Sequence, residues 1–217
     1  MKQIKTSIWF MLGMVVLLFG FQKVRADDLV SWTKLNVGYR MTPKLKLATG
    51  VEFRLKNRLR DTDRFGLNVG GAYRVWSFLQ MDAAYEYHAQ AKGERGWKSR
   101  NRYYFGGELD FKSRYFRLRL RERWQQTFSG GSVESRFRTR VKGSFTLDGK
   151  SRFSPYLSME LYQPVGDRPF FWTARMRYTP GIEIKLTSHS MLDLYYCHQY
   201  EPKGSRNVLG FELNLSF

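Results

Sequence analysis

The most regular feature of the chain is an alternation of apolar and polar residues at every second position. Residues 115–128 read YFRLRLRERWQQTF, in which basic and apolar residues fall on opposite faces of an extended chain. The basic face carries Arg117, Arg119, Arg121 and Arg123. A period of two is the period of a β-strand, whereas a helix would spread these arginines around its circumference. The stretch therefore predicts a strand with one cationic face and one apolar face.

The same alternation recurs along the rest of the chain and predicts eleven strand candidates of about 10 to 15 residues. The first covers residues 29–40 and the last covers residues 206–217. Strands of soluble proteins are typically about 5 to 6 residues long, whereas a tilted membrane-spanning strand needs about 9 to 11. The lengths therefore favour a membrane β-barrel over a soluble sheet protein.

The connections between these strands alternate in length. The short ones are residues 41–44, 76–78, 112–114, 148–149 and 187–190. The longer ones, rich in Gly, Pro and charge, are residues 57–63, 90–98, 129–134, 164–171 and 201–205. Outer-membrane barrels have short periplasmic turns and longer extracellular loops. We therefore predict an all-β fold, a single antiparallel up-and-down transmembrane β-barrel of about 10–12 strands.

An odd number of strand candidates conflicts with this architecture. An even-stranded barrel with both termini in the periplasm needs ten or twelve strands. Either residues 29–40 do not span, which gives ten strands, or one further strand exists, which gives twelve. We expect ten.

The first 26 residues have the order of a secretory signal peptide. Lysines at positions 2 and 5 precede an apolar run over residues 8–21, and Val24, Arg25 and Ala26 close the segment. This run is shorter than the roughly 20 residues that a membrane-spanning helix needs. We expect residues 1–26 to be cleaved on export and residues 27–217 to form a barrel in the outer membrane of a Gram-negative cell. A retained membrane anchor is the alternative.

The last eleven residues, NVLGFELNLSF, place alternate apolar side chains on one face and end on an aromatic residue. The apolar residues are Leu209, Phe211, Leu213, Leu215 and Phe217. This pattern is similar to the terminal signature by which the barrel-assembly machinery recognises outer-membrane barrels for insertion. A soluble sandwich ending in an edge strand has no need of a terminal Phe.

The mature chain as a whole resembles a family of Gram-negative outer-membrane proteins called domain of unknown function 2490. The likeness is carried by Trp32 in SWTKL, by EFRLKNR at residues 52–58, by RLRLRERW, by SRFRTR and by the closing NVLGFELNLSF. The resemblance implies a fold and a location, and it implies no activity.

In a barrel, the apolar face of each strand meets lipid and the charged face points into the lumen. Arginine suits such an interior because its planar guanidinium binds carboxylates through two hydrogen bonds and keeps its charge. The predicted lumen-lining charged residues are Arg54, Arg74, Glu86, Arg102, Glu108, Arg117, Arg119, Arg121, Arg123, Arg136, Arg138, Arg140, Glu160, Arg175, Arg177, Glu183 and Glu212. Strict alternation also places Glu122 on the lipid side, so we expect a bulge there or a position near a rim.

Two functions fit this interior. The first is a structural or anchoring barrel with an Arg- and Glu-lined lumen, and the second is a small channel biased towards anions, because arginines outnumber acids. A membrane-embedded hydrolase is the weaker alternative. Its candidate residues are His88, with Asp82 and Glu86 on the same face, and His198 and His189. The chain is therefore predicted not to be an enzyme.

The chain is strongly basic, with 37 Lys and Arg residues against 19 Asp and Glu. Nucleic-acid binding fits poorly, because aromatics and arginines lie on opposite faces and cannot form one stacking surface. Membrane lipid is the expected partner, and anionic lipopolysaccharide is a possible ligand of basic loop residues. Those residues are Lys92, Arg95, Lys98, Lys203 and Arg206. One cysteine, Cys197, excludes an intramolecular disulfide, and three scattered histidines give no metal-binding spacing, so no cofactor is expected.

Overall fold

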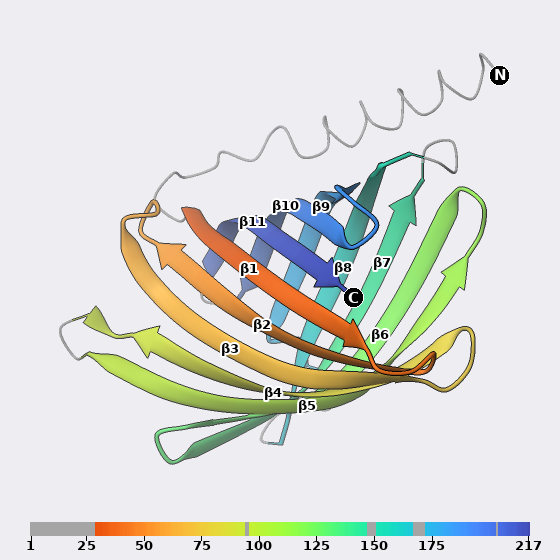
Figure 1. Ribbon diagram of the computed structural model, residues 1–217. Coiled ribbons are helices and arrows are strands. Elements are labelled where there is room, and N and C mark those ends of the chain that lie inside the picture. The colour runs from red at the N-terminus through yellow and green to blue at the C-terminus, as the bar shows by residue number, and fades with distance from the viewer. Residues whose placement is uncertain (1–28, 94–95, 147–150, 167–171, 203) are drawn as a thin grey trace.

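Eleven strands form a closed β-barrel in the computed structural model of the chain (Figure 1). The structure describes residues 29–93, 96–146, 151–166, 172–202 and 204–217. The expected signal peptide, the turn at residues 148–149, Arg95 and Lys203 lie outside the described residues. The strands are β1 (Leu29–Arg40), β2 (Leu45–Lys56), β3 (Asp61–Arg74), β4 (Leu79–Ala91), β5 (Trp97–Lys112), β6 (Phe116–Ser129), β7 (Ser132–Phe145), β8 (Phe153–Val165), β9 (Arg175–Lys185), β10 (Ser190–Glu201) and β11 (Gly204–Ser216).

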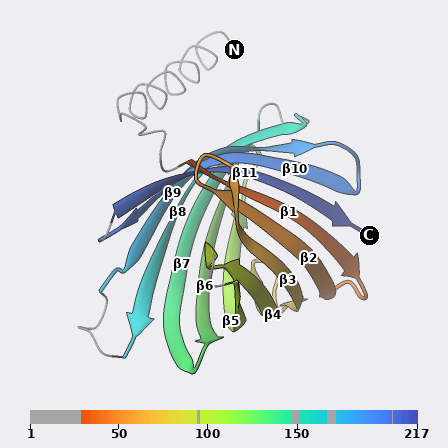
Figure 2. The ribbon, with the colours of Figure 1, turned by 90° about the vertical axis from the view of Figure 1, so that its left-hand side faces the viewer.

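Consecutive strands pair antiparallel around the ring, and β1 closes it by pairing parallel with β11. The two views in Figures 1 and 2 show the strands inclined around a common axis. We call the end at which β1 and β11 begin the long-loop rim, and the end at which they finish the short-turn rim. The predicted all-β barrel is confirmed, and no helix among the described residues is long and apolar enough to cross a membrane.

The parallel seam corrects two expectations. Residues 29–40 were expected to lie outside a ten-stranded barrel, but they form β1 and pair along their length with both β2 and β11. The expectation of an even number is wrong because a parallel pair closes a ring with an odd number of strands. The seam runs in register from Leu29 opposite Asn207 to Gly38 opposite Ser216. The backbone of Phe217 extends it, because its N–H donates to the Gly38 carbonyl and its carbonyl accepts from the Arg40 N–H.

The connections at the two rims differ less in length than the sequence indicated. Strand pairing between β6 and β7 continues to Ser129 opposite Ser132, which leaves only Gly130 and Gly131 between them. Both glycines have positive φ angles, 57° and 81°, as a tight two-residue hairpin requires. The β10–β11 connection is equally short. The longest connection, at residues 166–174 between β8 and β9, is on the rim where long loops were expected.

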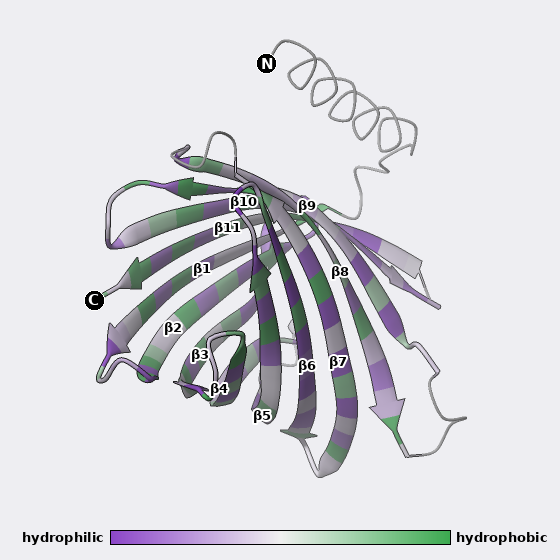
Figure 3. Ribbon diagram, turned by 90° about the vertical axis from the view of Figure 1, so that its right-hand side faces the viewer, coloured by the Kyte–Doolittle hydropathy of each residue, from purple (hydrophilic) through white to green (hydrophobic). Residues whose placement is uncertain are grey.

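Alternation sorts the side chains to the two sides of the wall. In Figure 3 hydrophilic and hydrophobic residues alternate along each strand. Large apolar side chains on the outer side are exposed, including Leu67, Val69 and Phe105, whereas buried charged residues such as Glu160 and Arg121 lie inside. On the inner side the Tyr195 ring lies over Gly210, where an added Cβ would come within 2.0–2.4 Å of ring atoms. This glycine is therefore required by close packing across the β10–β11 pair.

The parallel seam can be tested by engineered disulfides in a Cys197→Ser chain. Leu35→Cys and Leu213→Cys are opposite one another in the β1–β11 register, so we expect them to form a disulfide. The control pairs Leu35→Cys with Leu215→Cys, which is two residues out of register. Non-reducing gel electrophoresis and mass spectrometry measure the cross-link. Efficient cross-linking of the control pair, with none of the first, would contradict the seam.

Candidate functional site in the barrel interior

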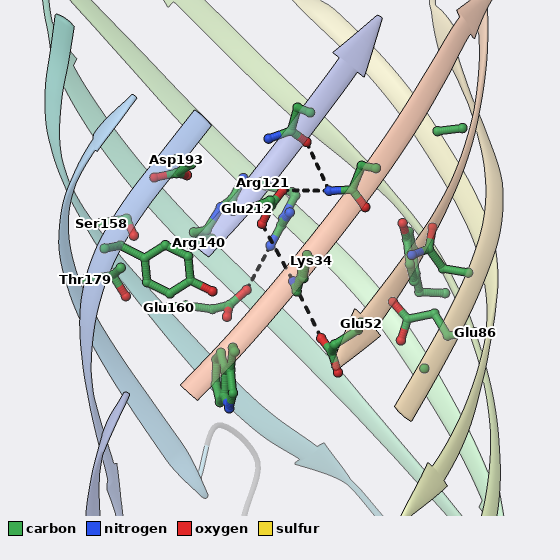
Figure 4. A pocket seen from close by; sticks show the side chains of 18 of the residues that line it. Lys34, Glu52, Glu86, Arg121, Arg140, Ser158, Glu160, Thr179, Asp193 and Glu212 are labelled. Atoms are coloured by element: carbon green, nitrogen blue, oxygen red, sulfur yellow. Dashed lines mark hydrogen bonds and ion pairs between the residues drawn. The ribbon is translucent and has the colours of Figure 1, made fainter. Parts of the chain in front are cut away.

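The barrel encloses a cavity of about 850 Å³ whose lining reaches both rims. Arg100 and Glu134 lie towards the long-loop rim, and Lys185 and His189 lie at the short-turn rim. Figure 4 shows charged side chains from several strands converging on this space. The basic lining residues are Lys34, Lys46, Arg54, Arg64, Arg100, Arg102, Arg121, Arg123, Arg136, Arg138, Arg140, Lys142, Arg175, Arg177 and Lys185. The acidic ones are Glu52, Glu86, Glu134, Glu160, Asp193 and Glu212.

The interior is therefore cationic, with fifteen basic against six acidic lining residues. Twelve of the seventeen charged residues predicted from the sequence line the cavity: Arg54, Glu86, Arg102, Arg121, Arg123, Arg136, Arg138, Arg140, Glu160, Arg175, Arg177 and Glu212. Of the other five, Glu108, Arg117, Arg119 and Glu183 form ion pairs beside it. Arg74 is exposed at the end of β3 and does not line the cavity.

Glu160 on β8 is the centre of the interior network. It is 7% exposed, and its carboxylate is 2.8 Å from Arg121, 3.0 Å from Arg138 and 3.4 Å from Arg177. The Tyr162 hydroxyl donates a further hydrogen bond to it at 2.7 Å. One carboxylate therefore connects β8 with β6, β7 and β9, and it leaves the cluster with more positive than negative charge.

The register of β6 and β7 places like charges directly opposite one another. Arg119 faces Lys142, Arg121 faces Arg140 and Arg123 faces Arg138. Like charges in direct cross-strand positions are destabilising unless other groups compensate them. Each member of this cationic ladder, which consists of those six residues, has an acidic partner: Glu183 for Arg119 and Lys142, Glu160 for Arg121 and Arg138, Asp82 for Arg123, and Glu108 for Arg140.

Trp32 is an interior residue that the strand pattern alone did not single out as a lumen group. Trp32 is 8% exposed, and two guanidinium groups lie close to its ring, with Arg54 at 4.0 Å and Arg177 at 4.6 Å from the ring centroid. Cation–π contacts of this kind stabilise a cation without neutralising it. The sequence could have indicated this, because Trp32 is two residues from Lys34 and so lies on the same, inward face of β1.

A second network of charged and polar side chains crosses the parallel seam. Lys34 on β1 lies 3.7 Å from Glu52 on β2 and 3.9 Å from Glu212 on β11, as Figure 4 shows. Asn36 donates hydrogen bonds to Glu212 at 2.8 Å and to Asn214 at 3.0 Å. These contacts join the three strands that close the ring. The sequence pattern did not identify Lys34 or Asn36 as interior groups, because it did not reveal the pairing of β1 with β11.

A third group lies towards the short-turn rim. Lys142 contacts Glu183 at 2.7 Å and Asp193 at 3.8 Å, and its ammonium lies 3.3 Å from the Tyr156 ring centroid. The Tyr156 hydroxyl donates to Asp193 at 2.8 Å. Asp193 was missed, although it occupies an inward position between two apolar residues of β10.

The three histidines lie in different places. His88 is inside the barrel, where its Nε2 is 3.1 Å from Glu86 and 3.2 Å from Arg102. His198 bonds to Asn207 on the outer side of β10, and His189 is in the turn at the short-turn rim, stacked on Phe217. The structure does not bring these histidines together. Among the described residues no group of three or more His, Cys, Asp or Glu side chains has a metal-binding arrangement.

Four of the terminal signature residues, Leu209, Phe211, Leu213 and Leu215, are at alternate outer positions of β11, between β1 and β10. Residues 30–209 match the family model described as Protein of unknown function (DUF2490). The chain belongs to this family. The match extends from β1 into β11 and so covers nearly the whole barrel, which confirms the resemblance seen in the sequence. No curated protein matches the chain.

The role of Glu160 can be tested by Glu160→Gln. The change leaves three interior guanidiniums without their shared carboxylate, and breaking a buried ion pair typically costs about 3–5 kcal/mol. Glu134→Gln is the control, because that side chain is 55% exposed and such pairs contribute about 0–1 kcal/mol. Denaturant unfolding of the detergent-refolded barrel, followed by tryptophan fluorescence, measures the difference. Equal unfolding free energies for the two variants would contradict a central role for Glu160.

Proposed function

We propose that this barrel spans the outer membrane of a Gram-negative cell and forms a narrow passage biased towards anions. The proposed membrane location rests on the outer face of the barrel wall. Large apolar side chains are exposed around the ring, for example Val69 at 58% and Phe105 at 55%, whereas monomeric soluble proteins rarely expose continuous apolar surfaces of this extent. A closed sheet also leaves no unpaired strand edge, as a bilayer demands.

Several other features support this location. Residues 1–26 have the composition of a signal peptide, and the outer face of β11 carries the alternating pattern on which the barrel-assembly machinery would act. The short-turn rim would face the periplasm and the long-loop rim the cell exterior. Lys92 and Arg206 near the long-loop rim could then contact the phosphates of lipopolysaccharide.

The cationic lining of a cavity that reaches both rims carries the functional part of the proposal. Spread over a barrel height of roughly 25 Å, its volume gives an average cross-section of roughly 30 Å², which suits small ions and solutes rather than polymers. Four acids beside the cavity, Asp82, Glu108, Glu183 and Glu201, also pair with lining bases, so ten acids face the fifteen bases and mobile anions would balance the remaining positive charge. Rings of basic side chains in an aqueous pore select anions.

A structural or anchoring barrel is the second candidate, and the Glu160 cluster favours it. That cluster joins four strands across the interior, so it braces the wall and narrows the space. Steady ion conductance distinguishes the two functions, because a passage conducts and a purely structural barrel does not. The proposal assigns no reaction to His88, His189 or His198, since the structure brings no second candidate catalytic histidine to His88.

Planar-bilayer recording under a KCl gradient tests the proposed passage. We expect steady current steps and a reversal potential that shows chloride preference. Arg64 is the most informative residue, because it lines the cavity, is 8% exposed and has no ion pair within 4.0 Å among the described residues. A unit charge about 10 Å away in water attracts chloride by about 0.4 kcal/mol and repels potassium by the same amount, so Arg64→Gln should lower the chloride-to-potassium permeability ratio about fourfold.

Arg74→Gln is the matched control, because it removes the same charge from the same strand outside the cavity. We expect its permeability ratio to equal that of the wild type. A folded, inserted barrel without conductance would favour the structural function, and cation preference would contradict the proposal.

A further inference from the structure

Arg64 is a buried, cavity-lining arginine that has no carboxylate partner among the described residues. It is 8% exposed, and its Nε is buried without a hydrogen-bond acceptor. Its direct cross-strand neighbour on β2 is another arginine, Arg54. The preceding residue, Asp63, lines a different cavity and forms no ion pair with Arg64. A buried charge without a partner is unfavourable, and a like charge directly opposite adds to the cost.

Two further arginines lie close to Arg64. Arg54 contacts Glu52 through its Nε at 2.7 Å and through its Nη2 at 2.8 Å. Arg102 on β5 donates to Glu86 through its Nη1 at 2.9 Å. Both carboxylates project into the cavity (Figure 4). Each of the three guanidinium groups lies within electrostatic range of the other two, and we call Arg54, Arg64 and Arg102 the arginine triad.

The arginine triad has N–H groups that its own carboxylates do not use. Across the part of the chain that the structure describes, no hydrogen bond or ion pair engages Nη1 of Arg54, Nη2 of Arg102 or either Nη of Arg64. Two of the three side chains are already held in place. The Arg54 guanidinium lies 4.0 Å from the Trp32 ring centroid, and Arg102 donates through Nε to Thr127 at 3.2 Å. Donors that are fixed before a ligand arrives bind it with a smaller loss of entropy.

A second cavity, of about 500 Å³, lies between the arginine triad and the long-loop rim. Its lining includes Lys56, which is two residues closer to that rim than Arg54 on β2. Its other basic lining residues are Lys92 and Arg206, against one acid, Asp63. A cationic mouth raises the local concentration of anions. An anion that enters from the long-loop rim would therefore meet the triad early in its path.

We propose that the arginine triad binds an oxyanion, the carboxylate or phosphate group of a small solute. A guanidinium presents its N–H groups in a planar fork that matches two oxygens of such a group. The oxyanion would give Arg64 the negative partner that the barrel wall lacks, and its remaining lone pairs would accept from Arg54 and Arg102. This names the class of anion that the passage carries and in that respect rests on the proposed function. Binding itself requires only the folded barrel.

Isothermal titration calorimetry of the detergent-refolded barrel tests the site, with sodium phosphate, sodium acetate and sodium chloride as probes. We expect saturable binding of phosphate or acetate, and none of chloride at the same ionic strength. Tighter binding of phosphate would identify phosphorylated solutes as the ligand class, and tighter binding of acetate would identify carboxylates. Saturable binding of neither oxyanion, or chloride binding as tight as theirs, would overturn the proposal.

Three variants test the role of the Arg64 guanidinium. Arg64→Gln should weaken oxyanion binding about tenfold or more, because it removes charge-assisted hydrogen bonds. Arg64→Lys keeps the charge without the fork, so it should also bind more weakly than the wild type. Arg74→Gln, on the same strand outside the cavity, should bind as the wild type does. Wild-type affinity in Arg64→Gln or in Arg64→Lys would overturn the triad as a site for oxyanions.

The variants at position 64 should fold, because Arg64→Gln removes a like charge opposite Arg54 and breaks no ion pair. Altered electrophoretic mobility before boiling checks this. Planar-bilayer recording then separates the site from the passage. Anion-selective current without saturable oxyanion binding would overturn the site and leave the passage standing. Saturable binding without current would support the site and overturn the passage.

Discussion

Closure of the sheet is the constraint on which the rest of this structure depends. Strands of 11–16 residues with one apolar and one charged face cannot stand alone, because each edge would expose unpaired backbone groups. Joining β1 to β11 removes the last two edges and separates the two faces completely. The charged half of every strand then shares one small interior, whatever its order along the chain. The network around Glu160, the Lys34 contacts and the cation–π contacts of Trp32 all follow from that confinement.

The excess of positive charge in the interior is not explained by the stability of the fold. Burying ion pairs seldom adds net stability compared with apolar packing, because desolvation offsets the attraction between the charges. The cationic ladder of β6 and β7 places three like-charged pairs in directly opposite positions, which is destabilising except where the acidic partners compensate it. A barrel selected only for stability has no need of this excess of guanidinium groups. In the proposed passage, solvated anions would offset the remaining positive charge, which would link the stability of the fold to ion passage.

The sequence predicted the barrel, the strand lengths and the inward direction of the charged rows, because all three follow from a period of two. It could not predict the number of strands, since that depends on whether the first and last strands meet parallel or remain apart. The cross-strand ladder and the Lys34–Glu212 contact were inaccessible for the same reason, because register is a property of two strands. Glu122 is the instructive case. Its outward direction was correctly predicted, but the expected bulge was wrong, because the chain keeps its register and leaves the charge on the outer face.

The accessibility of β6 in a bilayer tests the central claim most directly. Single cysteines at successive positions from 117 to 124, in a Cys197→Ser chain, would each carry a nitroxide label. The account predicts that even positions contact membrane-dissolved oxygen and that odd positions, which point into the charged interior, do not, with a period of two throughout. Broad access of a water-soluble nickel complex to Leu118, Leu120 and Trp124 would contradict it, because those side chains would then face water rather than lipid.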